Sequence, residues 1–144
     1  MSALVLVEHD NQSLKSATLN TVAAALACSS EVDLIVAGYA AEGVAQAAAQ
    51  IVGVRKVILI EADFLGNQLA EPVAAQILAL APAYDYILAP ATSHGKNVLP
   101  RVAAKLDVAQ ISDITKVISG EIHLSDLFML VMLLQPCNRV MLKN

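Results

Sequence analysis

The sequence predicts an α/β domain of three layers, with a mainly parallel sheet and helices on both of its faces. Three observations lead to this prediction. The 144 residues suit one domain built around a single core. Short apolar runs rich in Val, Ile and Leu alternate with longer segments whose apolar residues recur at helical spacing. A helix after each strand gives the right-handed crossovers of a parallel sheet.

Four runs are too short for helices and too continuous for a sheet with one wet face, so they are predicted as buried strands. They are ALVLVEH (3–9), VDLIVAG (32–38), KVILIEA (56–62) and YDYILAPA (84–91). The predicted helices cover Leu14–Cys28, Gly43–Ile51, Leu69–Leu80 and Val98–Leu106. We expect Ser13 to cap the first helix, Gly53 to end the second and Pro82 to stop the third. Strand character resumes around Thr115–Ile118.

Composition and charge exclude several classes of function. The net charge is −4, and the nine Lys and Arg residues are spread along the chain, which disfavours binding to nucleic acid or anionic lipid. The apolar runs are shorter than a membrane span, so a soluble protein is expected. Cys28 and Cys137 lack the spacing of metal ligands, which indicates reduced thiols. The N-terminus MSALVLVEHD lacks the features of a signal peptide, which predicts a cytoplasmic location.

Lone titratable residues lie near the predicted strand ends. His9 and Asp10 follow the first strand, where an acid–base pair is conceivable, but sequence neighbours rarely point at one substrate atom. A solvated loop is therefore the favoured interpretation, and the same holds for Glu61, Asp63 and His123. The first turn, EHDNQSLK, has no glycine, which argues against a dinucleotide-binding Rossmann domain. No catalytic and no metal-binding residue is predicted.

The segment PATSHGKN, residues 90–97, leaves two interpretations open. Its candidate phosphate-binding residues are Thr92, Ser93, Gly95 and Lys96, with Arg101 one turn into the following helix. In the structural alternative Thr92 or Ser93 caps that helix, Gly95 takes an unusual backbone angle, and Pro100 lies in the first helical turn. On spacing alone, the structural alternative is slightly favoured over phosphate binding.

The stretch YDYILAPATSHGKNVLPRVAAKLDVAQISDI, Tyr84–Ile114, resembles the alpha subunit of the electron transfer flavoproteins. The family pattern is P-A-T-S-x-G-K/R-N/D followed by P-R-x-A-A-x-L-D. LVLVEHDNQSLKSATLNTVAAA and VRKVILIEADFLGNQLAEPVAAQI also resemble its first domain, so the resemblance runs from about Ser2 to Gly120. It implies an adenine-nucleotide-hydrolase-like, Rossmann-like fold.

The resemblance also implies an electron carrier, not an enzyme. The family works as a heterodimer with a beta subunit and carries electrons from acyl-CoA dehydrogenases and other flavin dehydrogenases, as in fatty acid β-oxidation, to a membrane-bound quinone oxidoreductase. FAD is bound mainly by a second, C-terminal domain, and AMP belongs to the beta subunit. On this interpretation the loop Thr92–Asn97 serves partner packing and helix capping. Asn97, Pro100 and Arg101 are then partner or structural residues, with Arg101 in an ion pair.

The tail from residue 121 does not match the family. Residues 1–120 are expected to form the alpha subunit's N-terminal domain and 121–144 an aberrant apolar tail, with the FAD domain absent. Read from the third base of each codon, with suitable synonymous codons, Glu121–Arg139 encodes Asp-Thr-Phe-Val-Arg-Pro-Ile-Tyr-Ala-Gly-Asn-Ala-Ile-Ala-Thr-Val-Gln-Ser, which resembles the family's next segment. We therefore expect a frameshift near Ser119–Glu121. The apolar block Leu127–Leu134 is expected to mimic a strand or helix covering the sheet, or to stay exposed.

Three functions follow from these observations. The first is a scaffold fragment of the alpha subunit that packs on the beta subunit and is inactive alone. The second is a stand-alone nucleotide-binding α/β module that uses the Thr92–Lys96 loop. The third is a structural interaction domain without a redox role.

Overall fold

The computed structural model describes residues 2–108, 110–114, 116–118, 121–123, 129–133 and 142–143. Its strands are β1 Ser2–Leu6, β2 Glu31–Gly38, β3 Val54–Glu61, β4 Tyr86–Pro90, β5 Gln110–Ile114, β6 Lys116–Ile118, β7 Glu121–His123, β8 Met129–Leu133 and β9 Leu142–Lys143. Its helices are α1 Ala17–Cys28, α2 Glu42–Ala49, α3 Ala70–Leu80 and α4 Ser93–Leu106, with 3₁₀ turns η1 Asp63–Leu65 and η2 Ala81–Ala83. None of the described helices is long and apolar enough to cross a bilayer.

The main sheet has the strand order β3-β2-β1-β4-β8-β5. The first four strands are parallel, and β8 runs antiparallel to both β4 and β5. A second, small sheet has the order β6-β7-β9. The predicted strand near Thr115–Ile118 corresponds to β6, whereas the preceding β5 had not been predicted as a separate strand.

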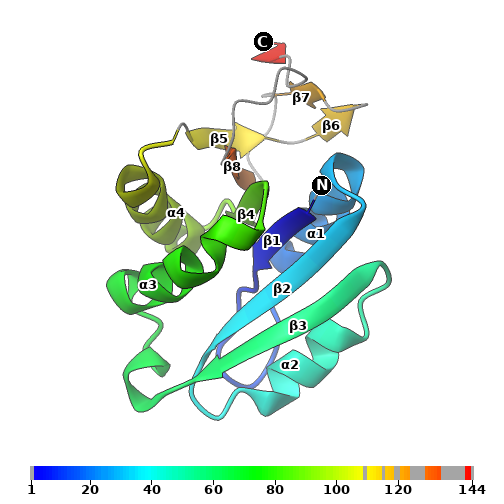
Figure 1. Cartoon of the computed structure of the whole chain (residues 1–144). Helices are drawn as coiled ribbons and strands as arrows, with labels where there is room; N and C mark the ends of the chain where they lie inside the picture. The colour runs from blue at the N-terminus through cyan, green and yellow to red at the C-terminus, as the bar shows by residue number, and fades with distance from the viewer. Residues whose placement is uncertain are drawn as a thin grey trace.

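The sheet is covered by helices on both faces, as Figure 1 shows, so the predicted three-layer α/β architecture is confirmed. Successive residues of a strand point to opposite faces. Leu4 and Leu6 of β1 therefore pack with α3 and α4, whereas Ala3, Val5 and Val7 pack with α1 and α2. Small side chains let the helices lie close to the sheet; the buried alanines of α1 and α3 are Ala24, Ala25, Ala70 and Ala74.

Two helices start at other residues than predicted. Helix α1 begins at Ala17, after Ser16, so Ser13 does not cap it. Ser13 instead donates its backbone N–H to Asp10 Oδ1 at 2.6 Å. Helix α4 begins at Ser93, five residues before the predicted start.

The helix ends were predicted more accurately than the helix starts. Helix α2 ends at Ala49, and Gly53 lies in the turn after it with a φ of +92°, a left-handed conformation that favours glycine. Helix α3 ends at Leu80, and Pro82 lies in the 3₁₀ turn that follows, as predicted.

The apolar block predicted at Leu127–Leu134 contributes β8, which lies within the main sheet between β4 and β5. It neither covers a face of the sheet nor forms a helix over its described part, Met129–Leu133. The remaining residues of the block lie outside the described ones, as does Cys137. Cys28 is half-buried at the end of α1.

A buried carboxylate lies within β2, where the sequence analysis predicted only an apolar strand. Asp33 is fully buried and accepts hydrogen bonds from Arg55 Nε to Oδ1 at 2.9 Å and from Arg55 Nη2 to Oδ2 at 2.6 Å. Tyr84 Oη donates to Oδ2 at 2.6 Å, and Lys56 Nζ lies 3.7 Å from the same oxygen. Burial by itself raises the pKa of Asp33, but the hydrogen bonds from Arg55 and Tyr84 and the two cations together lower it below its ordinary value. Asp33 is therefore a buried anion that ties β2 to β3 and to the segment before β4.

Candidate functional site

The loops at the carboxyl ends of the parallel strands form one edge of the domain. They cover residues 7–16 after β1, 39–41 after β2, 62–69 after β3 and 91–92 after β4. In open α/β sheets, ligands bind at this edge, at the point where the strand order reverses. That point lies between β1 and β4, so it is flanked by the loop of His9 and by the first turn of α4.

The predicted phosphate loop is the first turn of α4. Thr92 is the N-cap residue, and its Oγ1 accepts the backbone N–H of Gly95 at 3.4 Å. Lys96 donates its backbone N–H to the Thr92 carbonyl at 2.9 Å. Thr92, Ser93, Gly95 and Lys96 are thus brought together, but as a helix cap in which the Thr92 hydroxyl already has a donor.

Gly95 does not take the unusual backbone angle that was expected, since Gly53 alone among the described glycines has a positive φ. The reason for a glycine here is a close approach between chain segments. A Cβ atom on Gly95 would lie 2.0 Å from the carbonyl oxygen of Pro90, at the end of β4. The start of α4 is therefore packed directly on the end of the strand.

The other residues predicted in this region lie on the outer face of α4. Asn97 and Pro100 are exposed, and Pro100 lies inside the helix, not in its first turn, because the helix begins so much earlier. Arg101 Nη1 donates to Glu71 Oε1 of α3 at 3.3 Å. This pair crosses a groove of about 510 Å³ between the two helices, whose lining also includes Ala74, Ala75, Leu78, Ala104 and Lys105.

His9 is buried, so the prediction of a solvated loop is wrong for this residue. Its Nδ1 accepts the backbone N–H of Asn11 at 3.0 Å, and its Nε2 lies 2.9 Å from the carbonyl oxygen of Ala37. These partners assign the neutral tautomer with the proton on Nε2, because Nδ1 must accept and the carbonyl needs a donor. Burial is the main cause that lowers the pKa of His9.

The carboxylate of Asp10 is bonded within its own loop. Its Oδ1 accepts the backbone N–H groups of Ser13 and Gln12, and these bonds lower the pKa of Asp10. Lys15 Nζ lies 3.6 Å from Oδ2. His9 and Asp10 therefore share no substrate-facing site, and the structure does not assemble the acid–base pair that the sequence made conceivable.

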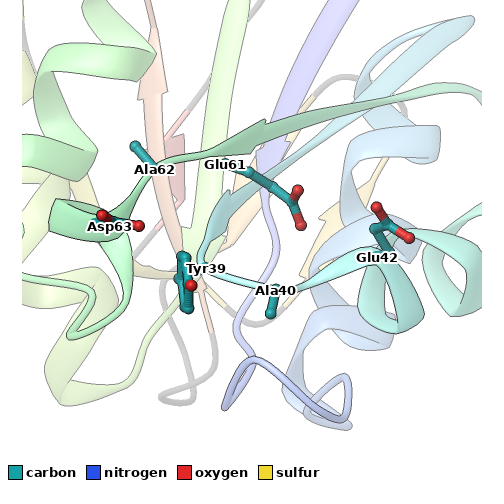
Figure 2. Close-up of a pocket in the computed structure, with 6 residues that line it drawn as sticks. All are labelled: Tyr39, Ala40, Glu42, Glu61, Ala62 and Asp63. Atoms are coloured by element: carbon teal, nitrogen blue, oxygen red, sulfur yellow. The ribbon is translucent and has the colours of Figure 1, made fainter.

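An open pocket of about 510 Å³ lies between the turns after β2 and β3. Its lining residues are Tyr39, Ala40, Glu42, Glu61, Ala62 and Asp63. Figure 2 shows Glu61 extending from the end of β3 toward the turn that carries Ala40, and Glu61 Oε1 accepts the backbone N–H of Ala41 at 2.9 Å. The pocket thus brings together Glu61 and Asp63, two of the predicted titratable residues, while the side chain of His123 lies outside the described part of the chain.

The carboxylates of this pocket disfavour an anionic ligand such as a phosphate. Among the described residues, no three His, Cys, Asp or Glu side chains are arranged to bind a metal ion.

The sequence analysis missed two residues of this region. One is His94, which is half-buried and contributes, through its charge, to lowering the pKa of His9. The other is Asn11, whose only visible signal was its place after the first strand.

The cap of α4 gives a direct prediction. Replacing Thr92 by alanine should destabilise the domain by about 0.5–1 kcal/mol, toward the low end for N-caps because the bond to Gly95 N is long. Urea denaturation monitored by circular dichroism measures this change. Thr92→Ser keeps the hydroxyl and should stay close to the parent, and equal losses in both variants would contradict the capping role.

The comparisons with known proteins agree on one family. Residues 3–126 match the family model described as the electron transfer flavoprotein domain. The chain is 50% identical over 121 residues to the electron transfer flavoprotein subunit alpha of Pseudomonas aeruginosa, and 50% identical over 123 residues to that of Bradyrhizobium diazoefficiens. Each alignment covers 39% of the relative and 84% or 85% of this chain, respectively. The subunit of Paracoccus denitrificans is 44% identical over 122 residues, again 84% of this chain and 39% of the relative. The chain therefore belongs to the electron transfer flavoprotein family, and the relatives that it resembles are alpha subunits.

Proposed function

We propose that this chain is the scaffold portion of an electron transfer flavoprotein alpha subunit and that it packs on a beta subunit. The observation that carries the proposal is the 50% identity to alpha subunits over 84% of the chain. In this proposal the heterodimer, in the cytoplasm, carries electrons from acyl-CoA and other flavin dehydrogenases to a quinone oxidoreductase. Its role is that of an electron carrier in pathways such as fatty acid β-oxidation, and this chain alone is inactive.

The described residues do not fit FAD. In the first turn of α4 the Thr92 hydroxyl already accepts the backbone N–H of Gly95, and Gly95 packs against the Pro90 carbonyl oxygen, so both residues have structural partners. The pocket at the same edge is lined by three carboxylates, which would repel a pyrophosphate. The chain spans 39% of the length of the relatives that it matches. We therefore propose that FAD is bound by a part of the intact alpha subunit other than these residues, and AMP by the beta subunit.

The groove between α3 and α4 supplies the test of partner binding. Arg101→Ala should weaken binding to a cognate beta subunit about tenfold, measured by titration calorimetry or by retention on the immobilised partner. The melting temperature should change little, because the ion pair between Arg101 and Glu71 is exposed. Glu71→Ala is the matched control: it breaks the same pair but keeps the cation.

Comparison of the two variants separates the roles of Arg101. Binding lost in Arg101→Ala and kept in Glu71→Ala supports a contact of Arg101 with the partner. Binding unchanged in both variants removes Arg101 from the interface, whereas no binding by the parent chain contradicts the scaffold function itself.

A stand-alone nucleotide-binding module is the second candidate, favoured by the position of α4. The amino end of this helix lies beside the reversal of strand order, where nucleotides bind in related architectures. Thermal unfolding in the presence of AMP or ATP decides between the candidates. A rise in melting temperature that Lys96→Ala abolishes would support the module, and no rise with either nucleotide would reject it.

We also propose that residues from about 121 onward are translated out of frame, after an N-terminal domain of residues 1–120. The support is the alternative frame of Glu121–Arg139, in which the first two bases of most codons are fixed and the product still resembles the family. Sequencing the gene around codon 120 tests this. If no alternative frame encodes that segment, the proposal is wrong.

A further inference from the structure

The ring of His9 connects two separate backbone segments from a buried position. Only 5% of the residue is exposed. One ring nitrogen accepts the N–H of Asn11 in its own loop, and the other donates to the carbonyl of Ala37 near the end of β2. Both bonds require the neutral ring, because a protonated Nδ1 is a donor and would face the donor N–H of Asn11.

Asn11 extends this connection to the two neighbouring turns. Its Oδ1 accepts the backbone N–H of Tyr39 at 3.0 Å, after β2. Its Nδ2 donates to the carbonyl of Gly66 at 2.8 Å, after β3. Asn11 itself has a φ of 68°, a left-handed conformation, and His9 bonds its N–H group. His9 thus stabilises the residue that joins three loops.

The space for this arrangement depends on Gly38. A Cβ atom there would lie 2.5 Å from Asn11 Oδ1 and 2.8 Å from His9 Cε1. The loop after β1 is therefore packed directly on the end of β2. One wall of the pocket in Figure 2, the turn carrying Tyr39, is fixed by the same contacts.

We propose that His9 is a pH-sensitive latch that fixes the loop of residues 8–16 to the turns after β2 and β3 while its ring is neutral. A proton taken from solvent onto Nδ1 removes the acceptor for Asn11 N–H. The contacts of Asn11 with Tyr39 and Gly66 then loosen, and the turn that lines the acidic pocket becomes mobile.

The charges around His9 set the pH at which the latch opens. Burial lowers the pKa of His9 most strongly, and His94 on α4 lowers it further, while the Ala37 carbonyl and Asp10 raise it. Burial lowers the pKa of His94 most strongly, and Glu8, next to His9 in the sequence, acts on that ring through its charge and raises its pKa. Since the folded-state pKa is lowered, the neutral form stabilises the fold above the ordinary value of 6.5. This contribution is lost as the pH falls below 6.5 toward the folded-state pKa.

Amide hydrogen exchange tests the latch on the full chain. Between about pH 7.5 and pH 5, the protection factors of the Asn11 and Tyr39 amides, corrected for intrinsic exchange, should fall about tenfold. His9→Gln has no titrating ring and should show low protection at both pH values. His94→Gln, the matched control, should keep the pH response and move it to a slightly higher pH, because it removes a neighbouring positive charge.

Ring NMR of the parent protein keeps the proposal testable even if His9→Gln does not fold. The His9 ring shifts should titrate together with the amide shifts of Asn11 and Tyr39. Titration of the ring without any change in those amides would overturn the proposal. So would a pH response that His9→Gln shares with the parent, or a ring that stays neutral to the end of acid unfolding.

Discussion

Replacing Gly95 by alanine is expected to destabilise the domain by about 3 kcal/mol, the cost of overpacking a site that has no room. The new Cβ would lie 2.0 Å from the Pro90 carbonyl oxygen, a backbone atom that moves only if β4 or α4 moves. Alanine is favoured over glycine inside a helix by about 1 kcal/mol, which is too little to offset this contact. The net effect is therefore strongly destabilising.

Equilibrium denaturation in urea measures this effect, and neighbouring exposed positions supply the controls. Ser93→Ala and Lys96→Ala introduce the same residue within the same helical turn, at exposed sites, and should change the free energy of unfolding by no more than about 0.5 kcal/mol. A Gly95→Ala variant as stable as these controls would mean that the strand and the helix do not pack as closely as described.

Replacing Asp33 by alanine is expected to cost about 3 kcal/mol, because a buried charged acceptor is lost. The variant leaves the hydroxyl of Tyr84, a residue that is only 6% exposed, without this acceptor. It also removes both hydrogen bonds between Arg55 and Asp33, so that Arg55 keeps only its bond to Glu31 Oε2 among the contacts with β2 that the structure describes. Asp33→Asn keeps the shape and one acceptor oxygen, so it should cost less. Arg55→Met should be worse than Asp33→Asn, because it leaves the buried carboxylate without its main partner.

The pH dependence of the free energy of unfolding tests whether the charge on Asp33 is the cause of this loss of stability. The folded-state pKa of Asp33 is lowered, so its contribution is present above the ordinary value of 3.8 and is lost as the pH falls below that value. The difference in unfolding free energy between the parent and Asp33→Asn should therefore be largest near neutral pH and shrink in acid. A difference that is constant with pH would show that packing, not ionisation, explains the loss.

The sequence predicted the parallel strands well because each is a short, continuous apolar run. It predicted helix starts less well, because a residue type that favours capping does not cap a helix at every position where it occurs. In the structure Ser13 bonds to Asp10, whereas Thr92 caps α4. Whether such a residue caps the helix depends on the conformation of the whole loop between the strand and the helix. Because α4 starts at Ser93, Pro100 lies inside the helix and not in its first turn.

The candidate site depended on contacts between segments far apart in the sequence. His9 was expected in solvent, and its burial follows from the missing side chain of Gly38, almost thirty residues later. Asp33 lies in a strand that otherwise reads as apolar, and its partners Arg55 and Tyr84 come from two other parts of the chain. Glu61 and Asp63 were noticed in the sequence because they lie at or just after the end of a predicted strand, but a solvated loop was the favoured interpretation for both.

The position of β8 has a consequence for the order in which the chain can fold during its synthesis. Residues 2–106 contain the four parallel strands and four helices as one uninterrupted stretch, so this part leaves the ribosome before β8 is made. Among the described strands, β8 alone joins β5 to the main sheet, and β8 is made after β5. At about 5–20 residues per second, the outer side of β4 therefore stays without its neighbour for roughly a second or more.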